Sequence, residues 1–231
     1  MWDIIVSSTP EIVWAGIKYT IPLAVISFII GFIIAVFTAI VRITTPKGNP
    51  VVLFFWRLLK WFLNFYVWLF RSTPLLVQLF IIFFGLPNAG IQFNAFTAGI
   101  ITFSLNTGAY CSETIRGAIS SIPDSQWEAA YSIGMTHRQV LFRIIFPQAL
   151  RVALPPLSNS FIGLVKDTSL ASSITILEMF MVSQQITAKN YEPLLMYSIV
   201  AAVYAVFCTV LTILQHYLEK RMSRYVQVTG E

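Results

Sequence analysis

The sequence predicts an all-α integral membrane protein, with about five transmembrane helices and a helical cytoplasmic loop in one domain over residues 1–231. Hydrophobic residues make up 57% of the chain and charged residues only 11%, against about 25% charged in an average soluble domain. The mean hydropathy is +0.75. Long apolar runs alternate with short polar breaks, which is the pattern of a chain whose surface faces hydrocarbon.

The first apolar run covers 12–41 and stops at Arg42. About thirty helical residues extend about 45 Å, more than the ~30 Å hydrocarbon core, so we expect this helix to tilt or to project. Residues 1–11 contain acidic and no basic residues, unlike the start of a secretory signal peptide. We therefore expect the run to be retained as a span.

The next segment, 51–71, is rich in aromatic residues but carries Arg57, Lys60 and Arg71. Three cations make it a poor span, and they favour an amphipathic helix at the inner membrane surface. The alternative is that it forms the early, buried part of a long second helix. The second span is then expected over 75–86, between Pro74 and Pro87.

Three further spans are expected, over 95–119, 157–176 and 194–218, followed by a polar tail at 219–231. Twelve of the 15 basic residues fall before span two, around the loop after span three, or in the tail. Because basic residues accumulate on the cytoplasmic side, we expect a multi-pass protein with its N-terminus outside and its C-terminus inside. This distribution accounts for the net charge of +5, so no nucleic-acid partner is expected.

The loop at 120–150 predicts two short helices. Ser125 with Glu128, and Thr136 with Gln139, each have the spacing of a capping box. Gly134 stands where the first helix should end in a left-handed turn. Behind the second box, an apolar face is formed by Val140, Leu141, Ile144 and Ile145. Such a knob either docks into a partner protein or lies on lipid.

A longer motif runs through this loop, and it is carried by Glu128-Ala129-Ala130, Gly134, Ile144, Phe146 and Pro147. It resembles the signature loop of the permeases of ATP-binding cassette (ABC) importers, with Phe146 in place of the usual leucine. In that family the loop enters a cleft on an ATP-binding subunit and couples to it. The resemblance implies this ATPase-coupling role for Glu128, Ala129, Ala130, Gly134 and Pro147.

Other segments resemble the polar amino acid uptake branch of this family, namely 71–78, 108–113 and 164–169. The resemblance implies a subunit of the bacterial cytoplasmic membrane that is not an enzyme and carries no cofactor. ATP and Mg would be held by an ATP-binding cassette subunit. A second permease subunit, with an identical copy favoured over a related chain, and an extracytoplasmic substrate-binding protein would complete the importer.

Ionisable residues inside a span are costly and are usually functional, and Lys166 and Asp167 are the clearest here. Counted from Pro156, Lys166 lies about 15 Å into span four, near the bilayer midplane. Neighbouring helical residues point about 100° apart, so these two do not simply pair. Each needs a partner on another helix, a water-filled cavity, or a ligand with both charges, such as an amino acid.

Further candidate substrate-binding residues are Asn106 and Tyr110 of span three and Ser160 and Ser169 of span four. Glu113 and Arg116, three residues apart, are better explained as a structural pair. Permeases for basic amino acids tend to have an acidic residue at the position of Ser160. Residues 167–171 and 178–181 resemble cystine-type permeases, so cystine is favoured over glutamine, glutamate or basic amino acids.

Other classes are less well supported. The sequence contains no Gly-x-x-x-x-Gly-Lys-Ser/Thr phosphate loop and no His-Glu-x-x-His or Gly-x-Ser-x-Gly motif. Cys111 and Cys208 lie in apolar stretches, and His137 and His216 are isolated, so no catalytic or metal site is expected. The main alternative is a stand-alone secondary transporter or channel, against which stand the docking loop and the lack of an inverted repeat.

Overall fold

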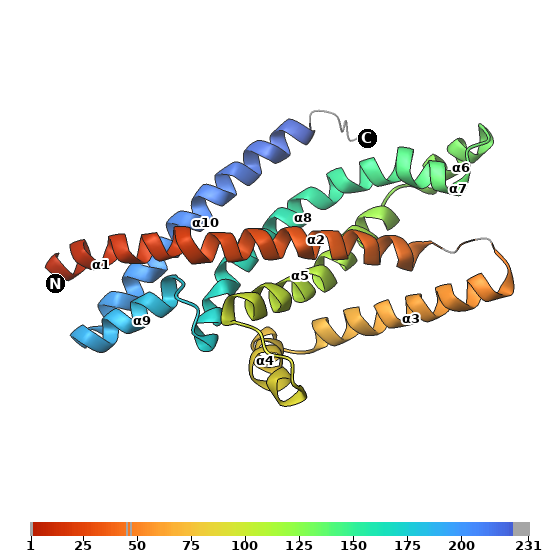
Figure 1. Cartoon of the computed structure of the whole chain (residues 1–231). Helices are drawn as coiled ribbons and strands as arrows, with labels where there is room; N and C mark the ends of the chain where they lie inside the picture. The colour runs from red at the N-terminus through yellow and green to blue at the C-terminus, as the bar shows by residue number, and fades with distance from the viewer. Residues whose placement is uncertain (1, 45, 47, 224–231) are drawn as a thin grey trace.

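The structure is a computed structural model that describes residues 2–44, 46 and 48–223, and every regular element in this part is a helix. The long helices run roughly along one direction (Figure 1). The start of α1 and helix α9 (Met179–Asn190) lie at one end of the bundle, which we call the distal end. Helices α6 (Asp124–Ser132) and α7 (His137–Val140) lie at the other, which we call the loop end. The loop end is the one predicted to be cytoplasmic.

The first helix is longer than expected. It is continuous from Trp2 to Ile43, through α1 (Trp2–Ala15), the π-helical turn η1 (Gly16–Thr20) and α2 (Ile21–Ile43). Its 42 residues extend about 63 Å, so it projects well beyond a ~30 Å hydrocarbon core, as the sequence predicted.

Prolines explain the three π-helical turns in the described part of the chain. Proline lacks the N–H that an α-helix needs, and its ring pushes away the carbonyl four residues earlier, so the turn widens. Each π turn ends two residues before a proline: Gly16–Thr20 before Pro22, Ile81–Gly85 before Pro87, and Leu141–Ile145 before Pro147. The helices therefore bend at these prolines without stopping, and the sequence showed only that Pro147 would end or kink its helix.

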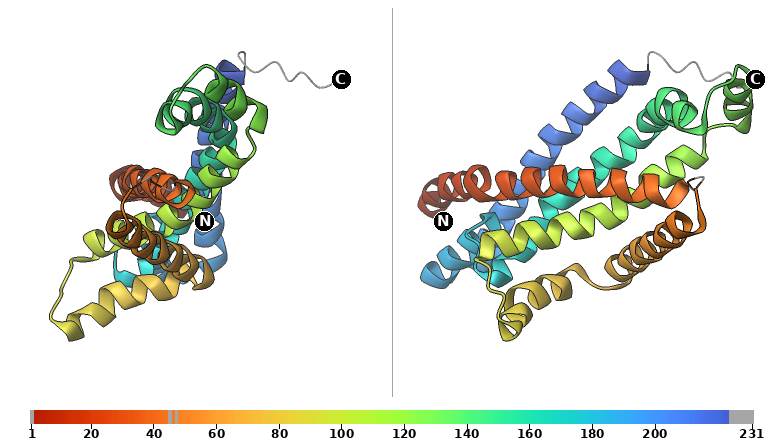
Figure 2. Two further views of the ribbon diagram at one scale, coloured as in Figure 1. Left: turned by 90° about the vertical axis from the view of Figure 1, so that its right-hand side faces the viewer. Right: turned by 45° about the vertical axis from the view of Figure 1, so that its right-hand side comes forward.

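The segment expected at the membrane surface forms a long helix that is a candidate span, in place of the surface helix predicted for 51–71. Helix α3 (Pro50–Ser72) is long and apolar enough to cross a bilayer, and it runs beside the bundle (Figures 1 and 2). Several of its aromatic side chains, including Trp61 and Phe65, are exposed, whereas Tyr66 is buried. Arg71 consequently lies at the far end of α3 from the loop end, and not among the cytoplasmic cations.

The predicted second span is also wrong. Residues 75–89 form α4 (Leu75–Phe80), the π turn η2 (Ile81–Gly85) and the 3₁₀ turn η3 (Leu86–Ala89). This stretch is too short to cross a bilayer, which needs about 20 residues. It lies across the bundle, below its middle in the view of Figure 1, and α3 takes its place as a candidate span.

The third predicted span is the interior helix α5 (Ala95–Ser120). It is not among the four helices of the described chain that are apolar enough to span by composition alone, which are the first helix, α3, the helix that contains α8 (Phe146–Asp167), and α10 (Pro193–Ser223). Thirteen of its 26 residues are buried. A helix surrounded by protein can carry polar residues that a lipid-facing helix cannot.

Helices α2 and α5 pack along most of their lengths (Figures 1 and 2). Their seam is made of small residues, since Ala35, Ala39 and Gly31 are buried on α2. A Cβ on Gly31 would lie 2.9 Å from the Ser104 carbonyl oxygen. In a membrane, where apolar surfaces gain little by leaving lipid, such close backbone approach is a main source of helix association.

A buried carboxylate joins the elements of the distal end. Glu178, fully buried, caps α9 by accepting from the backbone N–H of Phe180 at 2.8 Å and of Met181 at 2.6 Å. The Tyr204 hydroxyl of α10 donates to it at 2.8 Å. Burial raises the pKa of the Glu178 carboxyl to about 7. Because this pKa exceeds its unfolded value near 4.3, the group favours the folded state less as the pH rises through 7.

We expect Gly31→Val to lower the melting temperature of the detergent-solubilised protein, because the seam between α2 and α5 must open to admit the side chain. Overpacking of this kind costs roughly 1–3 kcal/mol. Gly117→Val is the matched control, since a Cβ at Gly117 meets nothing within 4 Å. Equal melting temperatures for the two variants would show that the seam is loose.

We expect Glu178→Ala to destabilise the protein by roughly 1–3 kcal/mol, through loss of the cap and a stranded Tyr204 hydroxyl. Thermal unfolding in detergent measures it. Glu11→Ala removes an exposed glutamate from α1 and should leave the melting temperature unchanged. A Glu178→Ala protein as stable as the control would mean that the hydrogen bonds around Glu178 contribute nothing.

Candidate functional site

A polar cavity of about 380 Å³ opens between α5, α8 and the break between α3 and α4. Four of the predicted substrate-binding residues line it: Asn106, Tyr110, Ser160 and Asp167. The other two, Lys166 and Ser169, are not among its lining residues. The buried Cys111, assigned to packing from the sequence, also lines the cavity.

The break between α3 and α4 forms one wall. Thr73 is extended because it precedes Pro74, and together with Leu75 these residues face the cavity. The Gln78 amide nitrogen donates to the carbonyl oxygens of Phe70 at 2.9 Å and Thr73 at 3.0 Å. Carbonyls released at a helix end need such partners inside a membrane. The sequence analysis missed this wall, although Pro74 between two apolar segments signalled a break.

Asn106 connects this wall to α5. Its amide nitrogen donates to the Gln78 side-chain oxygen at 2.9 Å. It stands eleven residues from the start of α5 and fourteen from its end, or about 17 and 21 Å at 1.5 Å per residue. The cavity therefore lies near the middle of α5.

Lys166 lies farther along its helix than the sequence predicted. The span was expected to start near Pro156, but α8 begins at Phe146 and contains both Pro155 and Pro156. Lys166 is consequently about 30 Å along α8 instead of about 15 Å. Asp167 nevertheless lines the same cavity as Asn106 and Tyr110 of α5.

Asp167 ends α8 and is exposed to the cavity. Within the described ranges, neither Asp167 nor Lys166 takes part in an ion pair, so the inter-helix salt bridge considered from the sequence has no partner there. Ser160, two turns earlier, donates to the Pro156 carbonyl oxygen at 2.9 Å. An ionisable group at this depth requires water or a ligand.

The pair predicted between Glu113 and Arg116 is confirmed, with a distance of 2.9 Å between carboxylate and guanidinium. A second cation, Arg42 from the end of α2, also pairs with Glu113. Arg42 further donates to the Asn64 side chain of α3 at 2.7 Å. The cluster thus joins α2, α3 and α5, a role for Arg42 that the sequence analysis did not foresee.

The helical loop has the turn that the sequence predicted. Gly134 has φ of +80°, and its N–H donates to the Tyr131 carbonyl at 2.9 Å. The capping box of Thr136 and Gln139 is confirmed. The box at Ser125 is not formed, because α6 begins at Asp124, with Pro123 at the cap position two residues before Ser125.

An aromatic stack closes the loop, and the sequence did not reveal it. The His137 ring lies 5.5 Å from the Trp127 ring, with 18° between their planes. Its Nδ1 atom is 2.7 Å from the Tyr131 hydroxyl. These contacts hold α6 against α7 across Gly134, so the loop is a defined knob.

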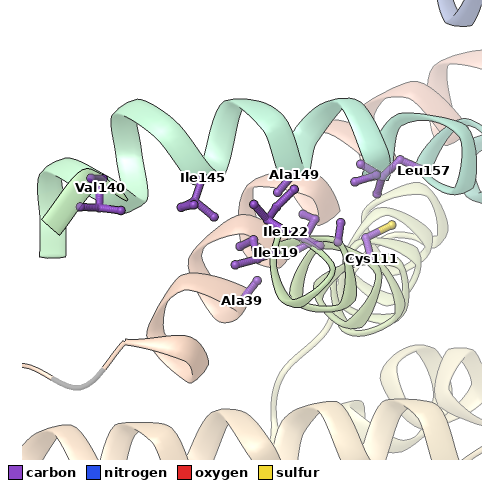
Figure 3. Close-up of a cluster of buried hydrophobic side chains, with 13 residues drawn as sticks. Ala39, Cys111, Ile119, Ile122, Val140, Ile145, Ala149 and Leu157 are labelled. Carbon is purple, nitrogen blue, oxygen red and sulfur yellow. The ribbon is translucent and has the colours of Figure 1, made fainter. Parts of the chain in front are cut away.

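The apolar face behind the loop anchors it to the bundle (Figure 3). Val140 and Ile145 are buried in one cluster with Ile119 of α5, Ile122 just beyond its end and Ala39 of α2. Glu128, Ala129 and Gly134 remain exposed, while Ala130 is buried. One side of the motif is therefore exposed to solvent, and the other side packs on the bundle. Pro147 is the second residue of α8.

Comparisons with known proteins give one answer. The family described as "Binding-protein-dependent transport system inner membrane component" matches residues 53–224. The chain is similar to the L-cystine transport system permease protein TcyB of Bacillus subtilis, with 49% identity over 97% of this chain and 92% of TcyB. It is also 34% identical to the probable glutamine ABC transporter permease protein GlnM of the same organism, over 90% of this chain and 92% of that relative.

Two solved structures share the fold. One is described as an amino acid ABC transporter with histidines, with a TM-score of 0.83 and 32% identity over 94% of this chain and 96% of that chain. The other is the MetNI methionine ABC transporter in an inward-facing conformation, with a TM-score of 0.73 over 90% of this chain and 96% of that one. At 18% identity, the second supports the fold alone.

Proposed function

Because the chain belongs to the binding-protein-dependent inner membrane components and is an amino acid permease subunit of the ABC type, we propose that its mid-depth cavity binds the amino acid during import. In this family the permease is not an enzyme, and ATPase activity lies in a separate subunit. The stand-alone secondary transporter is therefore set aside.

One observation carries the proposal. Asp167 is exposed to a cavity at the middle of the bundle and has no ion-pair partner within the described ranges. A free α-amino group supplies the missing positive charge, and Ser160 and Tyr110 supply hydroxyl groups around it. Lys166 and Ser169 lie outside this cavity, and we assign them to its margin, where a carboxylate could be received as the substrate enters.

We further propose L-cystine as the substrate. The relative of 49% identity is named for L-cystine, whereas the one named for glutamine has 34% identity. Ser160 is neutral, so the cavity offers a single carboxylate, which disfavours a cationic side chain. Cystine instead presents two amino acid ends, each with an ammonium and a carboxylate group.

The loop end is proposed to face the cytoplasm and to dock into an ATP-binding cassette subunit. The exposed Glu128, Ala129 and Gly134 form the contact, and the buried Ala130 and the helix-bending Pro147 support it. This chain needs no cofactor, since ATP and Mg are bound by the partner. Two permease subunits, preferably identical copies, form the pathway, and an external binding protein delivers the amino acid to the distal end.

Substitution of Asp167 by Asn tests the cavity. We expect the apparent dissociation constant for L-cystine to rise roughly ten-fold or more in the purified permease–ATPase complex, because one charge-assisted hydrogen bond contributes about 1.5–3 kcal/mol. Equilibrium binding of radiolabelled L-cystine measures it. Asp3→Asn, at the exposed start of α1, is the matched control. Unchanged affinity in Asp167→Asn would remove the cavity from substrate binding.

The loop is tested by Gly134→Val against Gly134→Asn. A Cβ at Gly134 meets nothing within 4 Å, so the cost comes from the left-handed backbone alone, which Asn tolerates better than a β-branched residue. We expect the tagged Val variant to lose co-purification with the ATP-binding subunit and the Asn variant to retain most of it. Equal retention by both variants would refute docking through this turn.

A further inference from the structure

A second polar cavity, of about 390 Å³, lies between α2, α3 and α5. Its charged lining residues are Arg42, Arg71 and Glu113. It shares Tyr110 with the first cavity, so the two cavities adjoin at this side chain. On α5 the first cavity begins at Asn106 and the second extends to Glu113, about 10 Å nearer to the loop end.

The second cavity has an excess of positive charge. Glu113 is already bound by two guanidinium groups, those of Arg42 and Arg116. Arg71 adds a further cation, and within the described ranges it takes part in no ion pair. An arginine among the packed helices of a membrane protein is costly and is usually retained for a function.

The position of Arg71 is set by its stacking on Tyr110. The guanidinium carbon lies 5.6 Å from the centre of the Tyr110 ring, and the Tyr110 hydroxyl is 3.5 Å from the Arg71 carbonyl oxygen. Stacking uses the flat face of a guanidinium and leaves its N–H donors available in the plane. The group is thus held at the boundary between the two cavities while remaining able to bind an anion.

We propose that the second cavity is a separate site for the carboxylate of the amino acid on its way to the loop end, with Arg71 as the binding group and Tyr110 as the partition. The inference rests on the proposed function of the first cavity. A planar guanidinium binds a carboxylate through two parallel hydrogen bonds. The ammonium group of the substrate would dissociate from Asp167 as its carboxylate binds Arg71. Neither site then needs to bind the substrate tightly.

A structural role for Arg71 makes a different prediction. If the cation only packed on Tyr110, then its loss would lower stability and would disturb the first cavity, which Tyr110 also lines. If it binds the carboxylate in transit, then its loss should slow uptake while the affinity of the first cavity persists. Measurements of equilibrium binding and of uptake therefore distinguish the packing role of Arg71 from the carboxylate-binding role.

The experiment compares Arg71→Gln and Arg71→Lys in the complete importer, reconstituted with its ATP-binding subunit and binding protein. Equilibrium binding and uptake per ATP hydrolysed are measured with L-cystine or L-glutamine, whichever the wild type transports. We expect Arg71→Gln to keep the dissociation constant within about two-fold and to lose roughly ten-fold in uptake per ATP, and Arg71→Lys to recover most of it because the charge is restored.

Three results would overturn the inference: full uptake by Arg71→Gln, an equal loss in Arg71→Lys, or an affinity loss as large as that of Asp167→Asn. The last result would place Arg71 in the first cavity. Failure of the proposed function looks different, because Asp167→Asn would then bind the amino acid like the wild type while Arg71→Gln still reduced uptake. Melting temperatures of all variants identify any that fail to fold.

Discussion

The close contact between α2 and α5 is the constraint on which the rest of the molecule depends. Small residues such as Gly31 and Ala35 let the two backbones approach, and α3, α8 and the helical loop then pack against this pair. Both cavities are bounded by α5. A helix buried in protein can carry Asn106 and Glu113 at a depth where lipid-facing helices are apolar, so the polar sites follow from this packing.

Some polar groups inside the bundle have hydrogen-bond or ion-pair partners within the protein, and two charged groups at the cavities have no ion-pair partner. The carbonyls freed at the end of α3 are satisfied by Gln78, and Glu113 is matched by two arginines. Asp167 lines one cavity and Arg71 the other, and neither takes part in an ion pair within the described residues. The two charges have opposite signs, as the two ends of an amino acid do.

Most local signals in the sequence were reliable, with the Ser125 capping box as the exception, and depth was not. The Gly134 turn, the Thr136 capping box and the pairing of Glu113 with Arg116 each depend on residues a few positions apart, and all three are formed. The segment 51–71 was predicted to be helical, but it was placed on the membrane surface because Arg57, Lys60 and Arg71 were interpreted as surface charges. Only the folded chain shows that Arg71 stacks on a tyrosine from another helix. The depth of Lys166 was miscounted because Pro156 stands inside a helix and not at its start.

Helix α8 connects the two functional regions as a single rod. Its first residues continue from the helical loop, and its last residue is Asp167. Its 22 residues extend about 33 Å, so a tilt of only about 5° about its midpoint displaces each end by about 1.4 Å in opposite directions. Such a displacement exceeds the range of hydrogen-bond lengths, about 0.5 Å for N–H···O bonds. A small tilt of α8 caused by movement of the loop is therefore enough to form or break a hydrogen bond at Asp167.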